Sequence, residues 1–148
     1  MKYTYSDYAL LYGANSEVEK SFNRILWDAE KIVNDLTTGV DGICKLRVAF
    51  PNDEYSKEAV KRAILAVVDK IAKVEEMNRK IASGGVVKSM SAGNESVSYE
   101  TGSEIASVAA SDSEQRMYYS RIAEHYLSGV GDSNGVNLLY RGMYPYRV

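Results

Sequence analysis

A long helical segment most limits how this chain can fold. From about Ser56 to Ala82 the sequence is rich in Ala, Lys, Glu, Val and Ile, and its apolar residues recur with a seven-residue period. The repeat contains Val60, Ile64, Val67, Ile71, Val74 and Ile81, with Asn78 at the remaining position. We predict one helix about 38 Å long at 1.5 Å per residue. Such a helix is either the centre of a helical bundle or a surface shared with another subunit.

A second amphipathic segment begins at Ser16. In the sequence SEVE we expect Ser16 to cap a helix and Glu19, three residues on, to complete a capping box. Apolar residues then form one stripe over about five turns. The stripe consists of Val18, Phe22, Ile25, Leu26, Ala29, Ile32, Val33 and Leu36. The segment ends at Thr37-Thr38-Gly39, where the glycine can adopt a left-handed conformation.

Two shorter helical patterns accompany these segments. A helical turn from about Ser6 to Leu11 places Tyr5, Tyr8 and Tyr12 on one side. A further helix is expected from about Asp112 to Leu127. Its predicted apolar side contains Met117, Tyr118, Ile122, Ala123, Tyr126 and Leu127. The pattern from 40 to 55 is irregular and predicts a connecting loop.

The segment 83–102 has neither a helical pattern nor a charge run. The glycines Gly84 and Gly85 stop the long helix. Weak alternation around the turn residues Ala92-Gly93-Asn94 fits a β-hairpin or an irregular extended loop. Serine is a modest strand former, and an isolated hairpin is only marginally stable in water. We therefore expect this segment to be supported by contacts outside itself.

The C-terminal segment 136–148 is aromatic, basic and apolar at once. Chain ends are usually polar and poorly ordered. This end instead contains Leu138, Leu139, Tyr140, Met143, Tyr144 and Tyr146. We expect it to dock, either on its own helical bundle or on a neighbouring protein.

The composition excludes several classes of protein. The chain has 18 basic and 20 acidic residues and a net charge of −2, so no overall field attracts it to nucleic acid or to an anionic membrane. No apolar run is long enough to span a bilayer, and the N-terminus lacks a signal-peptide core, which predicts an intracellular location. The 12 tyrosines suit either partly exposed contact surfaces or the rim of a core.

Groups for catalysis or metal binding are scarce. Cys44 is the only cysteine and His125 the only histidine, which excludes an internal disulfide and a cysteine-based zinc cluster. We expect Cys44 to be a small buried hydrophobe and His125 to lie at the solvent edge of its helix. The glycine-rich run 129–135 lacks the spacing and the lysine of phosphate-binding loops, and no serine has a nucleophile-elbow context. We expect no metal, no cofactor and no enzymatic activity.

Several motifs together resemble a known family, the small helical head-tail connector (head-completion or neck-adaptor) proteins of long-tailed bacteriophages and prophages of Gram-positive bacteria. The matching features are Tyr12-Gly13, Phe22 and Ala29 in the helix that leads into Thr37-Thr38, the long second helix, GGVVKSMSAGNESVSYE at 84–100 and NLLYRGM at 137–143. The most specific part is 88–99, where such families carry a serine-glycine-serine-valine-serine-tyrosine pattern. The resemblance spans the whole chain.

Together the patterns predict an all-α fold, a small helical bundle with one long central helix and an inserted extended loop or β-hairpin. Residues 1–148 form a single domain, with a helical core at about 16–82 and 112–128. The inserted segment lies at 83–102 and a docking tail at 136–148.

The resemblance implies a structural virion protein of the neck, at the head-tail interface, made in the cytoplasm of the bacterial host. Its subunits form a ring of about a dozen copies, in which each copy contacts the next. The ring sits under the portal, completes the head and continues the DNA channel towards the tail. Its implied partners are further copies of the chain, the portal protein, the next neck or tail-completion protein, and DNA that passes without sequence-specific binding; no membrane is involved.

Two groups of residues are assigned to contacts by their position. Contacts between subunits or around the lumen are assigned to Lys88, Ser89, Met90, Ser91, Asn94, Glu95, Ser96, Val97, Ser98 and Tyr99. Docking to the portal is assigned to Leu138, Leu139, Tyr140, Arg141, Met143, Tyr144 and Tyr146. The alternatives are a tail-completion or tail-terminator protein, which binds tail-tube ends, and a DNA-binding packaging factor of the small-terminase kind.

Overall fold

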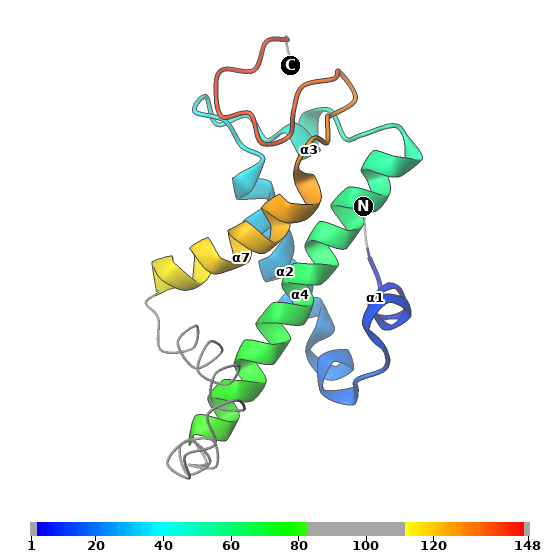
Figure 1. Ribbon diagram of the computed structural model, residues 1–148, viewed down its shortest axis with the longest axis vertical. Coiled ribbons are helices and arrows are strands. Elements are labelled where there is room, and N and C mark those ends of the chain that lie inside the picture. Colours follow the sequence, from blue (N-terminus) through cyan, green and yellow to red (C-terminus); the bar gives the residue numbers. More distant parts are fainter. Residues whose placement is uncertain (1–2, 83–111, 147–148) are drawn as a thin grey trace.

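Five helices form the part of the chain that the computed structural model describes, residues 3–82 and 112–146 (Figure 1). They are α1 (Tyr5–Tyr12), α2 (Ser16–Leu36), α3 (Lys45–Val48), α4 (Glu54–Ala82) and α7 (Asp112–Leu127). Within these residues the β-structure is limited to two isolated antiparallel bridges, Thr38–Cys44 and Gly131–Asn137. The prediction of an all-α protein is confirmed for this part of the chain. The loop or hairpin predicted at 83–102 lies outside the described residues.

The long helix α4 is the centre of the bundle, since α2 and α7 both pack against it and against each other. The predicted repeat positions Val60, Ile64, Val67 and Ile71 are buried. Burial extends beyond these repeat positions, because every residue from 63 to 69 is buried. A helix buried all round needs neighbours on more than one side. Here α1, α2 and α7 surround its middle.

The two ends of α4 have different surroundings from its middle. The helix begins at Glu54, before the predicted start, because the Asp53 carboxylate accepts a hydrogen bond from the Ser56 amide at 2.9 Å. This bond also holds the pKa of Asp53 below its usual value. Towards the C-terminal end, Asn78 is exposed and the neighbouring Met77 is buried. The polar repeat position therefore faces solvent, and the flexible methionine fills the space beside it.

Helix α2 presents the predicted apolar stripe, and all eight of its members are buried. The predicted cap is wrong by one residue: Asn15 caps the helix and Ser16 is its first residue. Asn15 has an extended backbone, so its Oδ1 atom reaches over the first turn and accepts from the amides of Glu17 at 3.1 Å and Val18 at 3.4 Å. Asparagine and serine are similarly effective caps, so the sequence did not distinguish them.

The tyrosines of α1 lie on one side of that helix, as predicted. The ring centroids of Tyr5 and Tyr8 are 6.1 Å apart, and those of Tyr8 and Tyr12 are 5.3 Å apart. Tyr8 is buried, and its hydroxyl donates to Asp69 on α4 at 2.9 Å. Burial raises the pKa of Tyr8, and the hydrogen bond to the carboxylate raises it further. This bond joins the short helix to the centre of the bundle.

Helix α7 has the predicted bounds but a slightly different buried side. Tyr119, Ala123 and Leu127 are buried against the bundle. Met117, predicted on the same side, is 56% exposed. It lies two residues from Tyr119, about 200° round the helix axis. His125 is exposed, as predicted.

Tyr119 makes stability sensitive to alkaline pH. Its burial, followed by the nearby Glu75 carboxylate, raises the pKa of Tyr119 to about 12. Because the pKa of Tyr119 is raised in the folded state, the protonated tyrosine contributes its full stabilisation below the ordinary tyrosine pKa of about 10. This stabilisation is lost as the pH rises towards 12. We expect Tyr119→Phe to gain about 2 kcal/mol relative to wild type between pH 9 and pH 12. Urea unfolding across that range measures the difference, and a pH-independent difference would contradict it.

The connection between α2 and α4 contains a short helix, α3, that the sequence analysis missed. One helical turn offers too few residues for a periodic pattern to emerge. Lys45 and Leu46 of α3 are buried. Cys44, expected to be buried, is only half-buried, and its sulfur lies 3.7 Å from the Thr37 hydroxyl.

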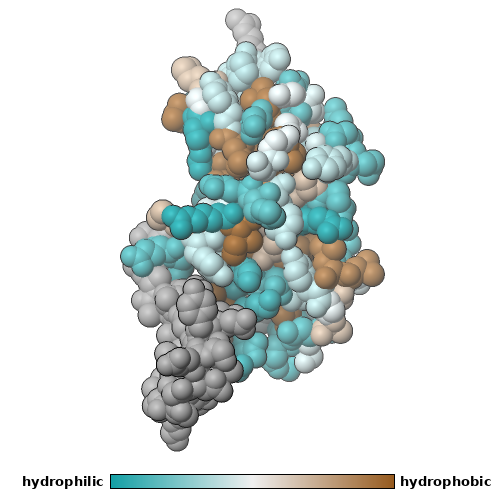
Figure 2. Space-filling view, viewed as in Figure 1, coloured by the Kyte–Doolittle hydropathy of each residue, from teal (hydrophilic) through white to brown (hydrophobic). Residues whose placement is uncertain are grey.

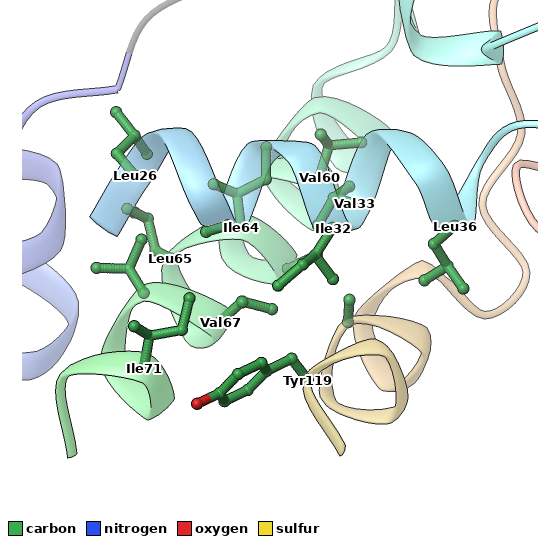
Figure 3. Close-up of a cluster of buried hydrophobic side chains, with 14 of the residues drawn as sticks. Leu26, Ile32, Val33, Leu36, Val60, Ile64, Leu65, Val67, Ile71 and Tyr119 are labelled. Atoms are coloured by element: carbon green, nitrogen blue, oxygen red, sulfur yellow. The ribbon is translucent and has the colours of Figure 1, made fainter. Parts of the chain in front are cut away.

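The core is continuous across the three long helices (Figure 3). Figure 3 shows Leu26, Ile32, Val33 and Leu36 of α2, Val60, Ile64, Leu65, Val67 and Ile71 of α4, and Tyr119 of α7. Complete burial of one such aliphatic side chain contributes about 1.5–3 kcal/mol. The helical body is therefore a stable base for the loops at its end.

Candidate functional site

The C-terminal tail folds back on the protein's own body. It runs beside the segment that joins α2 to α3, at one end of the molecule (Figure 1). The Val40 amide donates to the Arg141 carbonyl at 2.7 Å, and the Tyr144 amide donates to the Asp41 carboxylate at 2.7 Å. Of the two docking surfaces that the sequence left open, the protein's own bundle holds this tail.

Lys45 joins three parts of this end of the molecule. Its side chain is 1% exposed, and its ammonium donates to the main-chain carbonyls of Thr37, at 3.2 Å, and of Tyr140. The ammonium also lies 5.8 Å from the centre of the Tyr140 ring. Burial lowers the pKa of Lys45, while the nearby Asp41 and Asp132 carboxylates oppose that shift. One buried cation therefore links α3, the end of α2 and the tail.

Asp132 organises the turn that precedes the tail. Its buried carboxylate accepts from the amides of Asn134 and Val136, both at 2.9 Å, and from the Tyr144 hydroxyl at 2.6 Å. Burial raises the pKa of Tyr144, and its bond to Asp132 raises it further. The amides of the glycine-rich run thus bind a carboxylate of the same chain. This carboxylate fixes both the turn and the side chain of Tyr144.

The tail also approaches the C-terminus of α2 very closely. A Cβ atom added at Gly39 would lie 2.5 Å from the carbonyl oxygen of Gly142 and 3.3 Å from that of Arg141. The Arg141 guanidinium donates to the carbonyls of Asp35 and Thr38, both at 3.3 Å. A cation at this end of a helix is favoured, because the last carbonyls carry partial negative charge. Gly39 therefore leaves the space that the tail backbone occupies.

The seven predicted docking residues divide by exposure. Leu138 is fully buried in the core, Leu139 and Tyr144 are half-buried, and Arg141 lies against the end of α2. Arg141 is itself exposed, and the remaining three are exposed apolar or aromatic side chains: Tyr140, Met143 and Tyr146. Only these three present a large apolar side chain to a partner without rearrangement.

Two further exposed apolar side chains lie at the same end, Val40 before α3 and Val48 at its end. We name the five residues the loop-end surface: Val40, Val48, Tyr140, Met143 and Tyr146. Figure 2 shows apolar side chains among polar ones at this end of the molecule. The sequence analysis missed both valines, because they lie in an irregular segment where no periodicity marks an exposed side. The sequence did offer one signal for these valines: a large apolar side chain in a predicted loop can indicate a contact surface.

The ten residues assigned to subunit contacts, from Lys88 to Tyr99, all lie outside the described residues. Their assignment remains an expectation. Residues 3–82 and 112–146 provide the surfaces discussed below.

Comparisons with protein-family models, with curated proteins and with solved structures find no match. Among the described residues, no group of three or more His, Cys, Asp or Glu side chains is placed to hold a metal ion. No helix in the same part of the chain is long and apolar enough to cross a membrane.

Proposed function

We propose that the protein is a structural virion protein, a head-tail connector whose copies form a ring between the portal and the tail. The ring extends the DNA channel and completes the head. The motifs at 12–38, 84–100 and 137–143 support this proposal through their resemblance to such connectors. The structural observation that carries it is the loop-end surface, which gathers apolar side chains from two distant parts of the chain.

The loop-end surface has the composition of a protein contact. Tyrosine and methionine are enriched in the buried centres of interfaces, where a few such residues provide most of the binding energy. Exposed apolar residues gathered at one site mark binding surfaces more often than isolated ones do. Tyr140, Met143 and Tyr146 are accordingly the residues that we assign to the portal.

The base beneath this surface is already ordered in the free protein. Lys45 binds the tail at Tyr140, and Asp132 binds it at Tyr144. Ordering a flexible segment on binding reduces affinity, so a segment that is held in advance binds more tightly for the same contacts. The hydrogen bonds within the protein are therefore compatible with the proposed docking. These bonds hold the tail in place, and docking uses the side chains of the tail that face outward.

The proposed docking predicts the effect of a single charge. Met143→Asp places a carboxylate on the loop-end surface, where Met143 is 71% exposed. We expect it to weaken binding to purified portal rings by at least about tenfold, or ~1.4 kcal/mol, with an unchanged helical signal. Leu10→Asp is the matched control, because Leu10 is 83% exposed on α1, and it should bind like wild type.

Co-sedimentation with portal rings and with tail-tube ends separates the proposal from its nearest alternative. Wild-type protein bound to portal rings, with binding lost in Met143→Asp, supports the connector. Binding only to tail-tube ends would instead identify a tail-completion or tail-terminator protein. If Met143→Asp and Leu10→Asp bind the portal equally well, the loop-end surface is not part of the contact.

A further inference from the structure

Three arginines line a groove between the C-terminal part of α2 and α7. The groove has a volume of about 400 Å³ and is lined by Arg116 and Arg121 of α7 and Arg141 of the tail. The Arg141 guanidinium is fixed by the two carbonyls at the end of α2. Within residues 3–82 and 112–146 no ion pair involves Arg141. In the described part of the chain, no ion pair involves Arg121.

Of the two carboxylates that line the groove, Asp35 is already engaged in ion pairs. Asp35 accepts from Lys31 at 2.6 Å and from Arg116 at 3.4 Å. Glu124 is the second acidic side chain that lines the groove. The lining therefore has three arginines against two carboxylates, an excess of one positive charge. The groove is thus locally basic on a chain whose net charge is −2.

Apolar side chains line the same groove. Ile32 and Leu36 contribute from α2, and Met117 from α7. Met117, at 56% exposure, is both accessible and adaptable in shape. A bare phosphate would use the arginines alone. A peptide segment that carries a carboxylate beside a large apolar side chain would use both kinds of lining, so the groove favours a protein partner.

The first turn of α4 carries such a combination. The side chain of Glu54 is 94% exposed, and Tyr55 beside it is 78% exposed. Asp53 adds a second carboxylate at the helix cap. Lys57 lies 3.6 Å from Glu54, but an ion pair this exposed is weak and readily exchanged. In Figure 1 this turn lies at the upper right, and α7 begins on the opposite side of the molecule.

We infer that residues 53–55 of one copy of the chain dock in the arginine groove of the next copy. This inference rests on the proposed ring. It places the carboxylates of Asp53 and Glu54 against Arg116 and Arg121, and the Tyr55 ring against Met117. Since the two surfaces lie on opposite sides of one copy, the contact is head-to-tail, and repetition of the same step generates a ring or a filament rather than a two-fold dimer.

Cross-linking tests this contact directly, even when it is transient. Glu54→Cys and Arg121→Cys are made separately in a Cys44→Ala background, mixed in equal amounts and treated with a short bifunctional maleimide. We expect the yield of cross-linked dimer from the mixed pair to exceed the yield from either variant alone by about fivefold or more. This ratio corresponds to ~1 kcal/mol of contact free energy. The matched control pairs Glu54→Cys with Lys20→Cys, an exposed position on the first turn of α2.

A cross-linking yield no higher than that of the control pair overturns the inferred contact. A second pair carries Tyr55→Cys on one partner and Ser120→Cys, in the groove lining, on the other. Adding Glu54→Arg to the first partner should reduce the yield, and Arg121→Glu on the second partner should restore it. Electron microscopy of the wild-type protein with portal rings tests the proposed function separately. Rings without the mixed cross-link overturn this inference alone, whereas the mixed cross-link without rings or portal binding supports the contact and overturns the connector.

Discussion

Replacing Lys45 by alanine is expected to lower the free energy of unfolding by about 3–4 kcal/mol. The change leaves the Tyr140 carbonyl without its lysine donor and removes one of two donors to the Thr37 carbonyl, which keeps the Lys45 amide at 3.3 Å. It also leaves a cavity where a fully buried side chain was. Lys45→Met restores most of the volume but not the donor, so its loss should be about half as large. Urea unfolding followed by far-ultraviolet circular dichroism measures both values.

The same variants should also release the tail. Amide hydrogen exchange at Tyr140 and Tyr144 should become faster in Lys45→Ala than in wild type, while the exchange of the α4 core is much less affected. Lys20→Ala is the control, since this exposed lysine should change stability by less than about 0.5 kcal/mol. Lys45→Ala with wild-type stability would mean that the buried cation does not hold this end of the molecule together.

Gly39→Ala is expected to lower the free energy of unfolding by about 2–4 kcal/mol through one added methyl group. The methyl carbon would lie 2.5 Å from a main-chain oxygen of Gly142, and that backbone is itself held by the bond from Val40 to Arg141. The end of a flexible side chain could move aside at little cost, but hydrogen-bonded main chain can move only by breaking its bonds. The tail must therefore shift, with loss of the bond between Val40 and Arg141.

A neighbouring substitution separates this steric effect from a general effect of the loop. Val40→Ala removes an exposed side chain and should change stability by less than about 0.5 kcal/mol. Limited proteolysis should cut the tail of Gly39→Ala faster than that of Val40→Ala or wild type. Equal stability and equal cutting of all three proteins would show that the tail does not need the space at Gly39.

The long helices could be predicted from the sequence, because each has many apolar residues at helical spacing. The stripe of α2 and the bounds of α7 follow from that pattern alone. The burial of α4 from 63 to 69 does not, since it depends on α1 and α7 packing on further sides. The position of the α2 cap could not be predicted either, because Asn15 and Ser16 are similarly good capping residues. The hydrogen bonds in the structure identify Asn15 as the cap.

The candidate site was less predictable, because it depends on contacts between distant parts of the chain. The tail was identified by its aromatic composition, and its docking was expected. That Leu138 enters the core while Met143 stays exposed depends on where the tail crosses the rest of the protein. Lys45 could not be assigned from sequence at all: a lysine is normally exposed, and both of its carbonyl partners are main-chain groups that leave no residue-specific signal.

The proposed connector role depends most directly on one measurement, the mass and symmetry of the assembly that the wild-type chain forms with purified portal rings. Native mass spectrometry and electron microscopy of that mixture should show a closed ring of about a dozen copies, coaxial with the portal. A protein that stays monomeric alone is consistent with this result, since the portal can act as a template. A chain that remains monomeric and unbound at high concentration in the presence of portal rings would contradict the connector.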